Sequence, residues 1–222
     1  AANFKIAGLD VAAVQMKHEL FCNRNIDADA ARCGLARWAH DPQRDRAFEF
    51  EAHWALYVEN YLEGLHIPHV HPGLQAAIET ATYTTDLHRY ASVQWVAARP
   101  GEAAFAPPAG TPDHGRSLAA YYVWLFPNLM LNVYPWGLSV NVVLPQGPDR
   151  TRVLFRSFVG DAQRLDAGAG GGLDRVEAED EAIVEAVQRG VRARLYRGGR
   201  YAPDGERGVH HFHRLVCEFL AA

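Results

Sequence analysis

The stretch from residue 119 to 160 constrains the fold of this chain most, because it predicts three or four β-strands in succession. Its clearest part is a hairpin, in which the polar turn 145–150 separates the apolar runs 138–144 and 151–159. Residues 82–99 are rich in Thr, Tyr, Val and Trp and also predict strand structure. Strands joined by short turns pair antiparallel, so the middle of the chain predicts an antiparallel sheet.

Helical patterns lie on both sides of this strand-rich part. Residues 48–66 begin with alternating apolar positions and continue as a helical pattern with one broad apolar face. Residues 176–196 are strongly amphipathic, with acids first and arginines last, as the helix dipole favours, and residues 208–222 predict a final helix. Strands between long helices indicate an α+β domain in which a curved antiparallel sheet grips its helices. We expect residues 1–46 to be an N-terminal segment of unassigned type, followed by this domain over 47–222.

Composition excludes several classes of function. The chain has 222 residues, a net charge of −4 and scattered basic residues, so nucleic acid is not an expected partner. No apolar run reaches the roughly 18–20 residues that span a bilayer, and the first residues lack a signal-peptide pattern, so no membrane partner is expected. The three cysteines, Cys22, Cys33 and Cys217, form no disulfide framework, which favours a cytoplasmic location.

The segment around Pro68 concentrates residue types that bind transition metals. His66, His69 and His71 follow Glu63 closely, and neutral imidazole is the commonest protein ligand for such metals. His66 and His71 would lie about 140° apart around an ideal α-helix, which is unsuitable for sharing one ion. A common ion therefore requires the helix to end or become irregular between them, and Pro68 supplies a reason.

An acidic pair much later in the chain, Glu179 and Asp180, could complete a metal site. Two imidazoles and one carboxylate leave half of the coordination sphere open, which suits iron(II) because dioxygen and substrate need vacant positions. Zinc remains an alternative, since a zinc-bound water could use the same ligands for hydrolysis. Ordinary helix-end histidines and acids that stabilise a helix N-terminus are the simpler interpretation.

Three further groups of residues have open roles. Two histidines and two cysteines near the N-terminus have ligand types that suit zinc, but a spacing that matches no established site. Six aromatic residues of the strand-rich part are expected to be mostly core, with one or two touching a substrate. Three histidines near the C-terminus are expected at the surface or between helices. The three sets are His18, Cys22, Cys33 and His40; Tyr121, Tyr122, Trp124, Phe126, Tyr134 and Trp136; and His210, His211 and His213.

Three blocks in this order resemble the catalytic domain of the large (alpha) subunit of Rieske-type ring-hydroxylating oxygenases. They are NYLEGLHIPHVHPGL at 60–74, the block from YYVWLFPNL to PDRTRV at 121–153, and EDEAIVEAVQRG at 179–190. The resemblance extends from Phe48 to the C-terminus. It implies that residues 47–222 are a non-haem iron catalytic domain with a helix-grip fold of the START/Bet v 1 type.

The resemblance also implies roles for single residues. It makes His66, His71 and Asp180 the ligands of Fe²⁺, and it places Asn60 close to the iron. Glu63 stands where the family has an acid that conducts electrons between the iron of one subunit and the Rieske cluster of its neighbour. The two catalytic candidates are therefore Asn60 and Glu63.

The implied reaction is iron-dependent mono- or dioxygenation of a small aromatic or quaternary-amine-type substrate, as in aromatic hydrocarbon catabolism. The family is also typically trimeric. A Rieske 2Fe–2S cluster needs a Cys-x-His and a Cys-x-x-His motif, and neither occurs in this sequence. We therefore expect electrons from another protein, such as a ferredoxin, a reductase or a separate Rieske protein. The alternative is a helix-grip protein that binds a small molecule and has a vestigial metal site.

Overall fold

The computed structural model describes residues 38–107, 109 and 113–221. Eight strands form one antiparallel sheet in the order β1-β8-β7-β6-β5-β4-β3, and β2 also pairs with β8. The strands are β1 (Ala39–His40), β2 (Arg46–Phe50), β3 (Ile78–His88), β4 (Ala91–Ala98), β5 (Leu118–Leu125), β6 (Leu129–Tyr134), β7 (Gly137–Pro145) and β8 (Thr151–Val159). The antiparallel sheet predicted from the sequence is confirmed. The boundary expected at residue 47 stays a prediction.

The β7–β8 hairpin forms where the sequence predicted it, with Pro145 opposite Thr151. The stretch 82–99 has the strand structure that the sequence predicted, and it is divided between two strands. Strand β3 begins earlier, at Ile78, and the chain turns at Arg89 and Tyr90 into β4. Residues rich in β-propensity indicate extended structure but do not reveal a tight turn that lacks glycine or proline.

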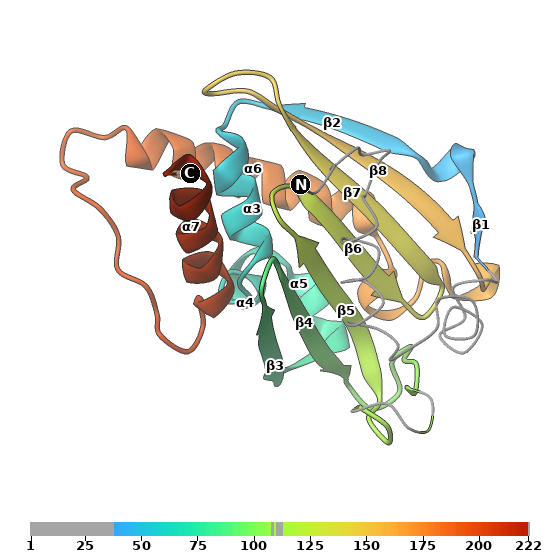
Figure 1. The fold of residues 1–222 in the computed structure, drawn as a ribbon. Coiled ribbons are helices and arrows are strands. Elements are labelled where there is room, and N and C mark those ends of the chain that lie inside the picture. Colours follow the sequence, from blue (N-terminus) through green and yellow to red (C-terminus); the bar gives the residue numbers. More distant parts are fainter. Residues whose placement is uncertain (1–37, 108, 110–112, 222) are drawn as a thin grey trace.

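The helices are α3 (Trp54–Tyr61), α4 (Ile67–Val70), α5 (Pro72–Ala77), α6 (Leu173–Val191) and α7 (Arg207–Leu220). In Figure 1, α3 lies between α6 and α7, and it contacts both of them as well as strand β7. Long helices therefore pack against an antiparallel sheet, which confirms the α+β class.

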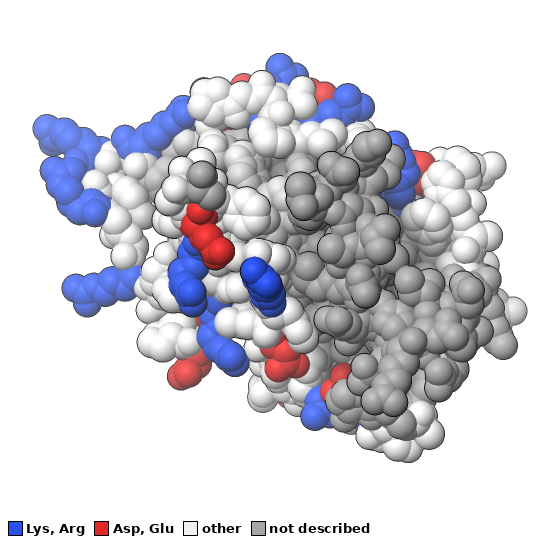
Figure 2. All heavy atoms as spheres, viewed as in Figure 1, with Lys and Arg blue, Asp and Glu red and all other residues white. Residues whose placement is uncertain are grey.

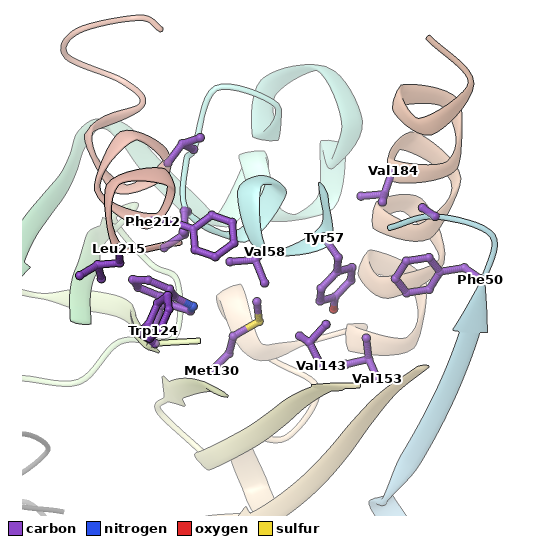
Figure 3. Packing of buried hydrophobic residues seen from close by; sticks show 14 residues of the cluster. Phe50, Tyr57, Val58, Trp124, Met130, Val143, Val153, Val184, Phe212 and Leu215 are labelled. Carbon is purple, nitrogen blue, oxygen red and sulfur yellow. The ribbon is translucent and has the colours of Figure 1, made fainter. Parts of the chain in front are cut away.

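A large apolar core fixes α3 against the sheet. Val58 of α3 and Phe212 of α7 have no exposed surface, and the Phe212 ring meets the ring of Trp124 edge-on at 5.5 Å between centroids. Figure 3 shows side chains from α3, α6 and α7 converging on residues of the sheet. Successive side chains of a strand point to opposite faces, so Val123 beside Trp124 belongs to a second apolar cluster on the other face.

Helix α3 ends at Tyr61, earlier than its apolar pattern predicted. The carboxylate of Glu63 accepts hydrogen bonds from the backbone N–H groups of Leu65 and His66. A continuing helix would use these N–H groups for its own carbonyls, so the side chain competes with helical bonding. Leu65, which lies within the helical pattern predicted over 48–66, is 50% exposed.

One group of basic side chains lies at an end of the molecule. Figure 2 shows several arginine side chains at the left, over the segment that joins α6 to α7, and further basic side chains scattered over the same face. That segment contains Arg192, Arg194, Arg197 and Arg200. No helix in the described part of the chain combines the length and the apolar character needed to cross a bilayer.

The packing of the core predicts a large difference between two leucines of α7. Leu215 is 3% exposed and Leu220 is 84% exposed. We expect Leu215→Ala to lower the free energy of unfolding by about 2–5 kcal/mol, because it removes buried contacts and leaves a cavity. Leu220→Ala should change it by no more than about 0.5 kcal/mol. Urea denaturation measures both, and equal losses would contradict the packing of α7 on the sheet.

Candidate metal centre

His66 and His71 lie at the two ends of the single-turn helix α4. His66 is its N-cap, and His71 is both its C-cap and the N-cap of α5. The irregularity that a shared ion requires is therefore present, because the long helix α3 has already ended before His66. The two rings stand nearly perpendicular, at 83°, with their centroids 5.1 Å apart.

Asp180 of α6 meets both imidazoles from the opposite side. Its Oδ1 lies 3.0 Å from His71 Nε2 and 3.6 Å from His66 Nε2. The potential ligand atoms of the three residues all lie within 4.8 Å of one another. The two separations from Oδ1 are compatible with a common ion, because two ligand atoms about 2.1 Å from one ion lie at most about 4.2 Å apart. The donor set of two imidazoles and one carboxylate fits iron(II).

Each of the three residues also has a hydrogen-bond partner outside the group. His66 Nδ1 bonds the carboxylate of Glu63, and His71 Nδ1 lies 2.9 Å from Glu179 Oε2. Both rings can thereby turn Nε2 toward Asp180. Asn60 donates from Nδ2 to Asp180 Oδ1 at 2.6 Å. In metal sites, such carboxylate partners fix the tautomer and orientation of a ligating histidine.

The charges around His71 favour a cation at this point. Burial by itself lowers the pKa of His71, but hydrogen bonds and charges from Asp180 and Glu179 outweigh it and raise the pKa above its usual value. The pKa of Glu179 is lowered mainly by its hydrogen bond to His71. Without metal, a proton on His71 can therefore supply the positive charge that these acids stabilise.

A cavity of about 90 Å³ adjoins the three residues. Of the six aromatic residues considered from the sequence, Tyr122 and Tyr134 line it, and the other four do not. Sequence reasoning missed four more aromatic residues of its wall. They are Tyr57, Tyr61, Tyr83 and Phe155. The spacing of Tyr57, Asn60 and Tyr61 on one helical face could have indicated two of them.

Glu177 is the buried acid that sequence reasoning also missed. It lines the cavity, is 6% exposed, and accepts hydrogen bonds from the Tyr57 hydroxyl at 2.8 and 2.9 Å. Burial raises its pKa well above the usual value, and the charge of Asp180 raises it further. Its position three residues before Asp180, on the same face of a helix, was the available signal.

The remaining candidates have other environments. Three of the four residues considered for zinc lie outside the described residues: His18, Cys22 and Cys33. The fourth, His40, pairs with Asp45 at the surface. Near the C-terminus, His213 bonds Glu59 at 2.8 Å, and His211 packs edge-on against a buried tryptophan. The C-terminal histidines are thus surface and packing residues, as predicted.

The raised pKa of Glu177 predicts a pH-dependent stability. The folded protein retains this proton above about pH 4.5, the usual carboxyl value, so folding becomes less favourable as the pH rises. Glu177→Gln keeps the shape and the Tyr57 hydrogen bond but cannot ionise. We expect the variant to gain stability over the metal-free wild type progressively as the pH rises above about 4.5, in urea denaturation. Glu185→Gln on the same helix is the matched control, and an equal gain there would contradict this origin.

Curated relatives of similar sequence are monooxygenases. The chloroplastic choline monooxygenase of Arabidopsis thaliana is 33% identical over 178 residues, which cover 77% of this chain and 40% of the relative. The carnitine monooxygenase oxygenase subunit of Escherichia coli (strain K12) is 30% identical over 179 residues, which cover 75% of this chain and 46% of the relative. The chain therefore spans less than half the length of either relative.

A solved quaternary ammonium Rieske monooxygenase has the same fold, with a TM-score of 0.68 at 23% identity over 87% of this chain and 54% of that one. The family model described as "Ring hydroxylating alpha subunit (catalytic domain)" matches residues 35–222. The fold expected from the resemblance is thereby confirmed. The chain belongs to the family of ring-hydroxylating alpha subunits and represents its catalytic domain.

Proposed function

We propose that this domain holds Fe²⁺ on His66, His71 and Asp180 and hydroxylates a small quaternary-amine-type substrate with dioxygen. One observation carries the assignment of the ligands. Both imidazoles direct Nε2 toward the same carboxylate oxygen, while a different carboxylate holds each Nδ1. Ordinary helix-end histidines have no reason to be fixed at both nitrogens, whereas ligands of a metal do.

Ferrous iron, when bound, supplies the activation of dioxygen that no protein side chain provides. The protein positions the donor atoms through its own contacts. Glu63 and Glu179 hold the two imidazoles in the tautomer that has a free Nε2. Asn60 restrains Asp180 by its hydrogen bond to Oδ1, and all three proposed ligands line the cavity.

The cavity wall provides the place for the substrate. Ile67, Leu74 and the aromatic side chains give it an apolar lining close to the proposed ligands. Such a lining limits access of water to the reacting groups. The two curated relatives are named for choline and carnitine, which are both quaternary amines. Tyrosine rings suit cationic groups of this kind, and both relatives are named monooxygenases, so we propose monooxygenation.

Electrons must reach the site from outside this domain. We propose that Glu63 links the site to the donor, because its carboxylate bonds His66 and its side chain is still 13% exposed. The donor would be a Rieske centre, a ferredoxin or a reductase. Inter-subunit electron transfer is described for the solved quaternary ammonium Rieske monooxygenase. A homotrimer in which neighbours serve one another's iron is the corresponding arrangement for this chain.

Iron content tests the ligand assignment. After anaerobic reconstitution we expect about one iron per wild-type chain and a loss of affinity well over tenfold in His71→Ala, because a ligand is removed. His69→Ala is the matched control, since His69 is an exposed histidine of the same short helix. Equal iron content in wild type and His71→Ala would refute the assignment. Stoichiometric zinc without iron in untreated protein would favour the hydrolytic alternative, and no metal would favour the binding protein.

A further inference from the structure

The charged residues that line the cavity are all acids or histidines. Glu63, Glu177 and Asp180 contribute three carboxyl groups, and no lysine or arginine is present among the described residues of the wall. Arg175 of α6 points elsewhere, since it bonds Glu179 and has a 72% exposed side chain. A ligand in this cavity would therefore meet no basic side chain from the described part of the wall.

Charge balance then limits the kind of ligand. A divalent ion contributes two positive charges, which two carboxylates balance while Glu177 keeps its proton. When a ligand with one positive charge binds, Glu177 can lose that proton, and three carboxylates then balance three positive charges. A ligand that carries a carboxylate adds a negative charge to a buried site, and an unpaired buried charge is strongly unfavourable.

Glu177 is the acid best placed to meet a cationic ligand. Glu63 is engaged by His66, and Asp180 is engaged by Asn60 and both histidines. The two hydrogen bonds of Glu177 come from one donor, the Tyr57 hydroxyl. Its single proton cannot satisfy both carboxylate oxygens. A cation beside this carboxyl group would favour its ionised form.

Tyrosine rings in the cavity wall suit an ammonium group. The rings of Tyr61 and Tyr122 meet edge-on at 6.2 Å between centroids, and those of Tyr122 and Tyr134 at 6.1 Å. An edge-on contact covers at most one face of a ring, and an uncovered ring face attracts a cation. The hydroxyl of Tyr122 is beside that of Tyr134, but the two do not meet the geometry of a hydrogen bond, so it is buried without a partner. A polar group of a ligand could bond it.

We propose that Glu177 and the tyrosine wall form the ammonium subsite of this cavity, and that the cavity accepts small organic cations that carry no carboxylate. Choline has this chemistry, whereas carnitine does not. The inference rests on the proposed function only in taking the cavity as the substrate site. Its test measures binding without turnover, so it stays separate from iron loading and from oxygen chemistry.

Calorimetric titration under anaerobic conditions tests the subsite with three probes. These are choline, the neutral analogue of choline in which a carbon atom replaces the nitrogen, and carnitine. We expect the iron-loaded wild type to bind choline at least about tenfold more tightly than either of the others, because only choline combines a cation with no anion. Similar affinity for choline and its neutral analogue would overturn the ammonium subsite, and similar affinity for carnitine would overturn the exclusion of carboxylates.

The variant Glu177→Gln tests whether Glu177 causes the preference for choline. The variant should lose about tenfold in choline affinity, while its affinity for the neutral analogue stays within about twofold of wild type. Its iron content should equal that of wild type, since Glu177 is not a proposed ligand, and its unfolding curve reports whether it folds. Glu185→Gln on the same helix is the control and should bind all three probes like wild type.

A folded Glu177→Gln protein that still prefers choline would overturn the role of Glu177. If the wild type fails to retain iron but still prefers choline, the proposed metal site is contradicted and the ammonium subsite is not.

Discussion

The contact between Asp180 and the two imidazoles is the interaction on which the site depends. This contact joins α6 to the segment around α4. His71 and Asp180 are 109 positions apart in the sequence. Bringing these polar groups out of water is unfavourable unless each finds a partner. Here Glu63, Glu179 and Asn60 supply the partners. The apolar core that fixes α3 and α6 on the sheet holds the cluster in place, so the fold acts as the scaffold of the site.

Two chemically different groups of residues line one cavity. The first group is the proposed metal ligands, the two imidazoles and Asp180. The second group is the tyrosine rings and the buried carboxyl group of Glu177. Helix α6 supplies an acid to each group, since Glu177 and Asp180 lie about one turn apart on one face. The same helix can therefore position a metal ligand and a group that recognises the charge of a substrate.

Local patterns predicted most elements of the fold. Alternation and turn residues located the β7–β8 hairpin, and amphipathic periodicity located α6 and α7 to within a few residues of their ends. The predicted length of the first helix was wrong, because Glu63 takes the backbone N–H groups that would have continued it. The ligand set came from the resemblance of three sequence blocks, and the structure brings those three residues together.

The sequence by itself determined the strands, the amphipathic helices and the residue types able to bind a metal, because each depends on neighbours a few positions apart. Tertiary packing decided what each acid does. The residue types alone left Glu179 and Asp180 both able to bind a metal, and the resemblance favoured Asp180. Neighbouring residues of a helix point about 100° apart, so the rotation of α6 decides their contacts, and it places Glu179 at Nδ1 of His71 and Asp180 at Nε2. The same rotation buries Glu177 in the cavity. Burial of a single acid depends on the packing of distant segments, which no local pattern contains.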